Sequence, residues 1–320
     1  MSLYIKKFRL HTQYEHYITG NTTVLPNVSY CEDVKDVHYN PIHDYSKDYF
    51  TTVALENGTI TFTPTNSNVI NYSIDNGNTW IEGSSVNVEN GVKVMWKGTM
   101  RPIEIEYNGI GKFSSTCNFN VEGNVMSLLY NDEFENKLEI EWIYCFFNLF
   151  YGAEKLTNAE NLILPATTLK INCYQQMFDG CTSLTSAPKI LPAKTSAVEC
   201  YTYMFHNCTS LVSAPELLAT TLANFCYNCM FSGCTSLTTA PELPATTLAM
   251  GCYEDMFNGC TNLNYIKAMF TTTPSDIYAY NWVDGVAVSG TFVKNSAATW
   301  NPEEVRGVNG VPTGWTIQTA

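Results

Sequence analysis

The sequence predicts a mainly β protein with short helical turns, which ends in a solenoid of stacked repeats and a C-terminal cap. One phrase recurs every 26–28 residues, short runs upstream of it alternate between apolar and polar residues, and 45% of the 320 residues are apolar. Such an apolar fraction is typical of a folded chain. We expect an N-terminal module over 1–50, an antiparallel β-sandwich over 51–130, a solenoid of about five coils over 131–270 and a cap over 271–320.

The N-terminal module is predicted to contain one strand and one helix. Residues 3–10 form the strand, Thr12 caps the helix and Gly20 ends it. The first residues are charged but lack a continuous apolar run behind them, so we expect no secretory signal here.

Residues 51–130 change to short alternating runs between Gly and Asn turns, which is the pattern of an antiparallel β-sandwich. The clearest runs are 51–55, 58–63 and 92–97.

Residues 73–80, Ser-Ile-Asp-Asn-Gly-Asn-Thr-Trp, match the Asp-box pattern found in sialidases and other β-proteins. We expect a hairpin turn in which Asp75 caps backbone amides, Gly77 takes a positive φ and Trp80 packs beneath. A propeller enzyme would need several such boxes and an arginine cluster. This single copy therefore predicts a structural turn.

The recurring phrase is Cys-Tyr-x-x-Met-Phe-x-x-Cys-Thr-Ser-Leu, followed by Ala-Pro. Its Met-Phe pair begins at Met177, Met204, Met230 and Met256, and a degenerate copy places Leu149 in the same slot. Self-similarity at such a period indicates stacked repeats, and an atypical terminal unit is needed to cover the last apolar face.

One repeat predicts a helical turn and a short strand. Tyr227, Met230 and Phe231 are spaced for one face of a helical turn that Gly233 ends. Pro241 closes the strand that follows, because proline cannot donate to the ladder.

The phrase Met-Phe-x-Gly-Cys-Thr-Ser-Leu, complete around Cys181 and Cys234, resembles the leucine-rich repeats of BspA-type surface proteins. The resemblance covers residues 140–320 and implies a leucine-rich-repeat-like solenoid in a host-binding protein. These repeats are a few residues longer than the family's commoner unit, which implies an extra bulge near Ala-Pro.

A second resemblance lies near the N-terminus, in residues 25–33 (Leu-Pro-Asn-Val-Ser-Tyr-Cys-Glu-Asp) and 37–41 (Val-His-Tyr-Asn-Pro). This stretch is similar to the openings of predicted structural, tail-type proteins of phages and prophages of gut Bacteroidales. It implies that residues 1–50 attach the chain to other virion proteins.

Cysteine usage leaves two interpretations open. Eight cysteines occupy repeat slots and could form buried thiol ladders or disulfides between coils, although parallel side chains suit a bridge poorly. They are Cys173, Cys181, Cys200, Cys208, Cys226, Cys234, Cys252 and Cys260.

The sequence predicts neither a metal nor a cofactor. Cys226-x-x-Cys229 lacks the second ligand pair of a zinc site, and the cluster of His38 and His43 with Cys31 and Asp44 lacks a spacing that fixes one. A nucleophile with its base, paired carboxylates and a phosphate loop are all missing from the pattern, so we expect no enzyme.

Binding is predicted at the positions that differ between repeats, next to each Met-Phe pair. These positions either face a partner or are solvated and free to drift. They are Gln175, Gln176, Asp179, Thr202, Tyr203, His206, Asn228, Ser232, Glu254, Asp255 and Asn258.

Charge and hydropathy restrict the partners. A net charge of −13 without a basic stripe argues against nucleic acid, and no apolar run approaches the ~18 residues needed to insert in a membrane. Our hypothesis is a non-enzymatic tail-fibre or surface protein of a phage virion that binds a host-surface glycan or protein, with self-association left open. The alternative is a BspA-like adhesin on the bacterial surface, and a glycan-active enzyme ranks third.

Overall fold

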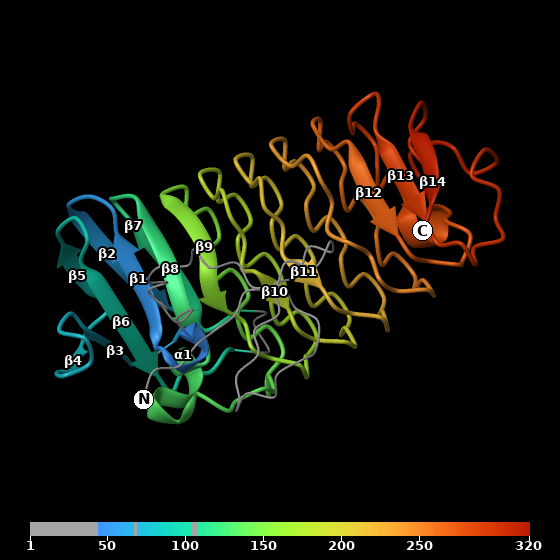
Figure 1. The fold of residues 1–320 in the computed structure, drawn as a ribbon. Coiled ribbons are helices and arrows are strands. Elements are labelled where there is room, and N and C mark those ends of the chain that lie inside the picture. The colour runs from blue at the N-terminus through green and yellow to red at the C-terminus, as the bar shows by residue number, and fades with distance from the viewer. Residues whose placement is uncertain (1–43, 67–68, 104–107) are drawn as a thin grey trace, which may run out of the picture. The chain divides into compact units, whose positions relative to one another are not determined.

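The computed structural model describes residues 44–66, 69–103 and 108–320 (Figure 1). The predicted strand and helix of the N-terminal module, with Cys31, His38 and His43 of its cluster, lie outside these residues. Asp44 to Ala320 form one compact unit. Its described residues are mainly β, as predicted, and their helices are short: η1 (Tyr45–Lys47), α1 (Ser127–Tyr130), η3 (Asn131–Glu133) and α2 (Asp276–Ala279).

Two sheets form the N-terminal part of this unit. One has six strands in the order β4-β3-β6-β1-β8-β9, and the other has three in the order β5-β2-β7. All pairings in them are antiparallel except β8 with β9. The strands are β1 (Phe50–Ala54), β2 (Gly58–Pro64), β3 (Ile70–Ser73), β4 (Ile81–Glu82), β5 (Ser85–Val88), β6 (Lys93–Gly98), β7 (Gly111–Ser115), β8 (Phe119–Asn124) and β9 (Leu156–Ile163).

The core of this part is a cluster of rings from both sheets. Phe113 of β7 lies 5.0 Å from Phe50 of β1 and 5.4 Å from Trp96 of β6, measured between ring centroids. All three side chains are fully buried. The alternation of buried and exposed residues along β6 explains this placement, because successive side chains point to opposite faces of a sheet.

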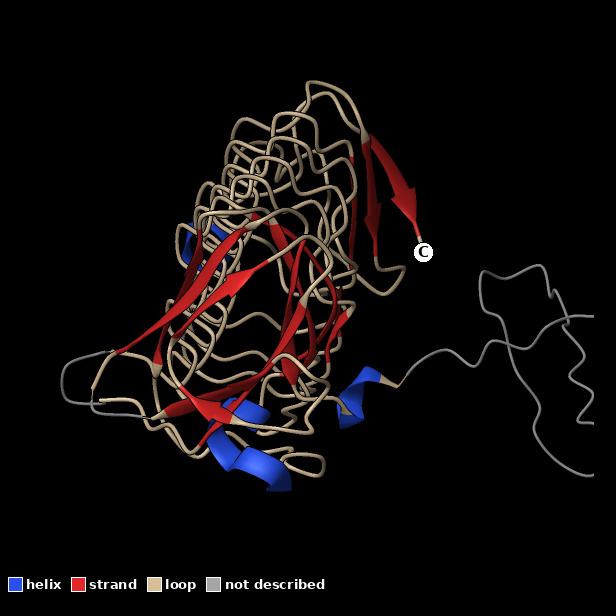
Figure 2. Ribbon diagram, turned by 90° about the vertical axis from the view of Figure 1, so that its left-hand side faces the viewer, coloured by secondary structure: helices blue, strands red, loops and turns tan. Residues whose placement is uncertain are grey.

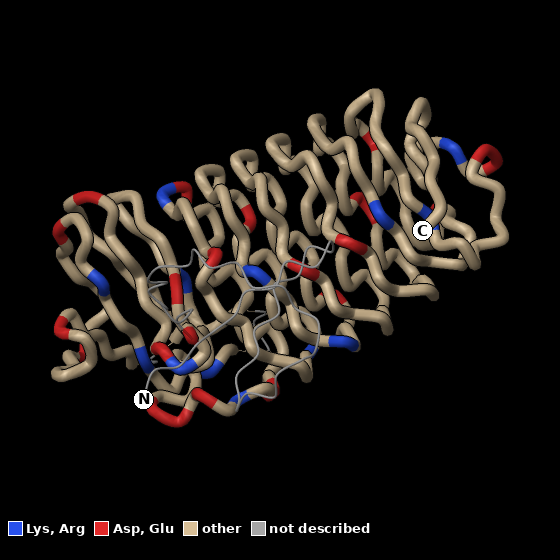
Figure 3. The backbone as a smooth tube through the Cα atoms, in the orientation of Figure 1, with Lys and Arg blue, Asp and Glu red and all other residues tan. Residues whose placement is uncertain are grey.

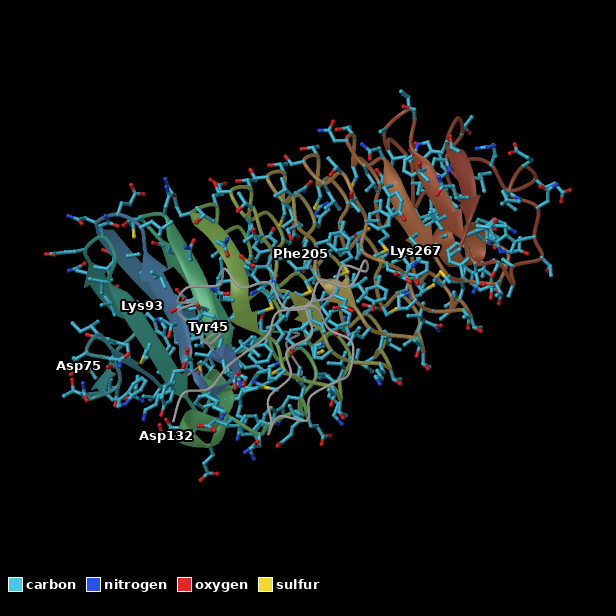
Figure 4. The ribbon with its side chains drawn as sticks, in the orientation of Figure 1. Tyr45, Asp75, Lys93, Asp132, Phe205 and Lys267 are labelled. Atoms are coloured by element: carbon cyan, nitrogen blue, oxygen red, sulfur yellow. The ribbon has the colours of Figure 1, made fainter. Side chains whose placement is uncertain are left out.

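The Asp box forms the turn between β3 and β4. Asp75 Oδ1 accepts a hydrogen bond from the backbone amide of Thr79 at 2.9 Å, and Gly77 has a φ of +83°, both as predicted. Hydrogen bonds, chiefly from Thr79, lower the pKa of Asp75 to about 2. Trp80 packs against Lys97, whose Nζ lies 4.2 Å from the ring centroid. The carboxylate is thus used within its own turn (Figure 4).

Replacing Gly123 by alanine is expected to destabilise this part of the fold. Gly123, in β8, has a φ of +79°, and an added Cβ would overlap the carbonyl oxygen of Tyr49. Left-handed alanine costs about 1–2 kcal/mol and overpacking about 1–3, so the free energy of unfolding should fall by about 2–5 kcal/mol in urea titrations.

Gly152 provides the matched control, because its φ is +62° and an added Cβ would meet nothing within 4 Å. Gly152→Ala should therefore cost only the backbone part, about 1–2 kcal/mol. Equal losses for the two variants would contradict the close approach of Tyr49 to Gly123.

The six-stranded sheet continues into the first repeat. β9 belongs to the degenerate repeat and pairs in parallel with β8 of the preceding part. Backbone pairing therefore crosses the expected boundary near residue 130, and the four-domain division stays a prediction.

The repeats, residues 144–268, form a stack in which each coil hydrogen-bonds to the next; we call it the repeat stack (Figures 1 and 2). Within a coil, successive backbone amides alternate between donating to the next coil and donating to a carbonyl of their own coil. The amide of Phe178 donates to the carbonyl of Met204 in the next coil at 2.9 Å, whereas the amide of Met177 donates to Tyr174 in its own coil at 3.3 Å. Half of these amides thus hold neighbouring coils together.

The prediction of a helical turn in each repeat is wrong. Tyr227, Met230 and Phe231 lie in consecutive turns, because every fourth residue takes a left-handed backbone conformation. In this repeat those residues are Phe225, Cys229 and Gly233, with φ of +54°, +52° and +75°. A left-handed residue ends a right-handed helix, so the chain turns instead of propagating.

The predicted short strand is reduced to isolated pairing. Thr239, just before Pro241, makes one parallel bridge to Tyr265, and Leu243 makes another to Ala268. Two-residue strands occur in earlier coils, β10 (Ile190–Leu191) and β11 (Glu216–Leu217), and they pair in parallel.

Side chains of equal kind form ladders through the repeat stack. Phe205 is fully buried and stacks on Phe178 at 5.2 Å and on Phe231 at 5.5 Å, with interplanar angles of 6° and 4° (Figure 4). A tyrosine ladder runs parallel to it, with Tyr201 5.8 Å from Tyr174 and 5.6 Å from Tyr227.

The cysteines of the repeats are free and buried. Each complete repeat has a second cysteine, three residues after the phenylalanine of its Met-Phe pair. The thiol of this cysteine donates to the carbonyl of a phenylalanine in the preceding coil, as Cys208 does to Phe178 at 3.1 Å and Cys234 to Phe205 at 3.1 Å. The thiol group therefore has a hydrogen-bonding role in addition to its packing.

A parallel sheet and two tryptophans, Trp282 and Trp315, close the far end. β12 (Tyr265–Ala268), β13 (Thr291–Lys294) and β14 (Thr316–Thr319) pair in that order. Trp282 takes the Met slot of the next coil, 6.1 Å from Phe257 of the last complete one. Its indole and that of Trp315 donate to backbone carbonyls, so their polar groups are satisfied in the interior.

Candidate binding face

The predicted binding residues lie in columns along the repeat stack. The amide of Gln176 donates to the carbonyl of Thr202, that of Tyr203 to Asn228 and that of Cys229 to Glu254, at 2.8–2.9 Å. Equivalent slots of adjacent coils therefore lie side by side. We call the eleven predicted residues, with Cys229, the turn face.

Half-burial characterises most of this face. Asp179 and Thr202 are buried, and the remaining predicted residues are partly exposed. The columns stand close because the coils are spaced by backbone hydrogen bonds, so polar side chains on adjacent coils reach one another.

The centre of the turn face is a polar network around Asp179. One carboxylate oxygen lies 2.9 Å from Nδ1 of His206 in the next coil, and the other accepts from the side-chain amide of Gln176 at 3.2 Å. The ring of Tyr203 meets the imidazole edge-to-face, with 5.1 Å between centroids. Four predicted residues from two coils are thus joined.

Cys229 extends this network and was missing from the predicted set. It occupies the slot of Tyr203 one coil further on, and a hydrogen bond with its side chain, together with burial, raises the pKa of Tyr203 to about 12. Burial raises the pKa of the Cys229 thiol to about 11. Alignment of the repeats by slot places Cys229 in the variable pair with Asn228, but its residue type kept it out of the predicted polar set.

An acidic group lies at the next coil. Asp255 Oδ1 accepts from the side-chain amide of Asn258 at 2.9 Å. Partial burial, and then the charge of Asp255, raise the pKa of Glu254. The face thus changes from a centre in which a carboxylate meets an imidazole and a phenol ring to an end with two adjacent carboxyl groups.

Two of the predicted residues turn away from this network. Thr202 is buried and donates its hydroxyl to the carbonyl of Phe225 at 2.7 Å. Gln175 accepts from Asn172, which also donates to Glu199. These contacts belong to a neighbouring column rather than to the Asp179 network.

The chemistry of the turn face is that of hydrogen bonding. Within residues 44–66, 69–103 and 108–320, no group of three His, Cys, Asp or Glu side chains is arranged for a metal. A nucleophilic thiol would need a lowered pKa, and the pKa of Cys229 is raised instead. Amides, carboxylates, an imidazole and a phenol ring together suit a polar ligand that carries some apolar surface.

Lys, Arg, Asp and Glu positions are sparse along the repeat stack (Figure 3), and no turn-face residue is Lys or Arg. Comparison with protein-family models, with characterised proteins and with solved structures finds no match. Among the described helices, none combines the length and apolarity required to cross a bilayer.

Proposed function

We propose that this chain is a non-enzymatic recognition protein of a phage virion, a tail-fibre or surface component whose turn face binds a host-surface glycan or protein. The observation that carries the proposal is the Asp179–His206–Tyr203 network, in which side chains that differ between repeats meet on a constant frame. A frame of identical ladders leaves such residues free to determine specificity.

The fold supports this proposal through its regularity. We propose that the repeat stack is a leucine-rich-repeat-type solenoid and that the two sheets before it form a β-sandwich. The coil-to-coil hydrogen bonds and the Phe and Tyr ladders support the first part, and the shared ring cluster around Phe113 supports the second. Repeat stacks of this kind offer long surfaces that suit macromolecular partners.

Residues 1–50 are proposed to attach the chain to other virion proteins, on the basis of the resemblance described above. A BspA-like adhesin of the bacterial surface remains the alternative, because the repeats resemble that family too. Gold-labelled antibody should mark intact phage particles. Label on bacterial cells alone would contradict the virion proposal and favour the adhesin.

Replacing His206 by alanine is expected to weaken binding to host cells about tenfold, since losing a central polar contact of a recognition surface costs about 1–2 kcal/mol. The measurement is a titration of labelled protein on intact host cells. Thr209→Ala is the matched control, because Thr209 is exposed on the same repeat but outside the turn face.

Two treatments of the host cells identify the class of receptor. Periodate oxidation should abolish binding if the receptor is a glycan, and protease treatment should abolish it if the receptor is a protein. Equal affinity of the His206→Ala variant and the unchanged protein would contradict a binding role for the turn face. Cleavage of host polysaccharide by the purified protein would favour an enzyme instead.

A further inference from the structure

A row of exposed apolar side chains runs along one edge of the repeat stack. In four coils its slot lies three residues before the tyrosine of Cys-Tyr, and Ile277 of α2 continues the row beyond the repeat stack, since its carbonyl accepts from the amide of Gly251 at 2.8 Å. The exposed fractions are 45% for Ile171, 36% for Val198, 48% for Met250 and 59% for Ile277. The middle coil has an exposed asparagine in this slot. We call the row the apolar ridge: Ile171, Val198, Asn224, Met250 and Ile277.

Backbone hydrogen bonds establish that the ridge residues are neighbours. The carbonyls of Val198, Asn224 and Met250 each accept from the residue that follows the ridge slot in the preceding coil, at 2.9–3.2 Å. At a spacing of about 4.8 Å per coil, the five side chains span roughly 19 Å.

Folding of the repeat stack does not require an apolar residue at the ridge position. Its side chains point outward, and the middle coil folds with Asn224 in the same slot. Exposed apolar side chains gathered in one row, unlike single ones, are a mark of interaction surfaces. The ridge is separate from the turn face, which lies beyond the buried Cys and Tyr columns.

The residues directly before the ridge residues form a second column. Its middle positions have small side chains, and its two ends have opposite charges. Three alanines, Ala197, Ala223 and Ala249, occupy the middle coils, Lys170 precedes them and Asp276 follows. Within the described part of the chain, neither charged residue forms an ion pair.

We propose that the apolar ridge binds the ridge of a second copy of this chain, antiparallel, about a two-fold axis through Asn224. The pattern of the ridge is symmetric about that axis, with two apolar residues on each side of one amide. Ile171 then faces Ile277 of the second copy, and Val198 faces Met250. An isologous interface requires such self-complementarity, and only a partner with the same coil period can match every row.

Polar groups complete the match. Asn224 meets its own equivalent, and a carboxamide both donates and accepts, so the two amides pair. In this orientation each Lys170 lies at the end that carries Asp276 of the second copy, whereas a parallel pair would bring like charges together. The short ridge predicts a small interface, and hence a dissociation constant of about 1–100 µM.

Sedimentation equilibrium of the full chain from 1 to 200 µM tests the proposal, these concentrations being chosen to bracket the expected constant of roughly 1–100 µM. We expect a monomer–dimer equilibrium that Met250→Lys shifts at least tenfold toward monomer. Val212→Lys is the matched control, because Val212 is 59% exposed and outside the ridge. Circular dichroism verifies that both variants fold.

A charge exchange tests the orientation. Lys170→Asp and Asp276→Lys should each weaken the dimer, and the double variant should restore it. A protein that stays monomeric at the highest concentration overturns the proposal, as does a dimer that Met250→Lys leaves unchanged. Failure of the double variant to restore the dimer overturns the antiparallel arrangement. None of these outcomes depends on host binding, so the proposed function is tested separately.

Discussion

Raising the pH from 9 toward 12 is expected to unfold the repeat stack. Burial raises the pKa of four ladder thiols from 9.0 to about 12, those of Cys173, Cys226, Cys252 and Cys260. The buried ladder tyrosines, such as Tyr201, also have a pKa raised well above 10.0 by burial. All these groups are neutral in the folded protein.

The sign of the effect follows from proton binding. Below pH 9 the thiols are protonated in both states, and their contribution to stability is fully present. Between pH 9 and 12 the unfolded chain loses these protons while the folded chain keeps them, so stability falls as the pH rises. Each thiol contributes a slope of about 1.4 kcal/mol per pH unit, and four thiols together contribute about 5.5 kcal/mol per pH unit.

Unfolding free energies measured in urea at several pH values, with a reducing agent present, test this expectation. Cys226→Ala removes one titrating group from the ladder and should flatten the alkaline slope by about 1.4 kcal/mol per pH unit. A slope that is unchanged in this variant would contradict the buried thiol as its cause.

Phe205→Ala is expected to lower the free energy of unfolding by about 3–5 kcal/mol, the usual cost of deleting a buried phenyl ring. Phe205 is fully buried between Phe178 and Phe231, so its loss leaves a cavity that both neighbouring coils line. The effect should appear in urea titrations followed by circular dichroism.

A matched control lies in the same repeat. Val212 is 59% exposed, and Val212→Ala should change the free energy of unfolding by less than about 0.5 kcal/mol. A small loss for Phe205→Ala would mean that the coils collapse into the space, and it would contradict a rigid aromatic ladder.

The local backbone was the part of the fold that residue spacing predicted least well. The spacing of Tyr227, Met230 and Phe231 fits one face of a helix, and a helical turn was predicted for that reason. They are buried in a series of consecutive turns instead, because Phe225 and Cys229 take left-handed backbone conformations. Phenylalanine and cysteine do not favour that conformation, so the sequence did not predict it. Glycine at Gly233 was the one visible signal.

The candidate site shows the same division. Sequence variation selected Asp179, Tyr203 and His206 as candidates, but the contact of Asp179 with His206 joins adjacent coils, 27 residues apart. Cys229 was set aside as an unpaired metal ligand, and only its position beside Tyr203 places it in the network. The apolar ridge was not predicted, because the sequence alone does not show whether an apolar side chain is buried or exposed.

The sequence by itself determined that the chain is mainly β, that one phrase repeats at a fixed period, and that the Asp75 turn is structural. Periodicity and turn chemistry are local properties, and they survive in any arrangement of the coils. The tertiary structure decided which slots meet, how the thiols and tyrosines are buried, and which face is polar and which edge is apolar. Those features depend on the hydrogen bonds between coils, which bring together residues that no local pattern connects.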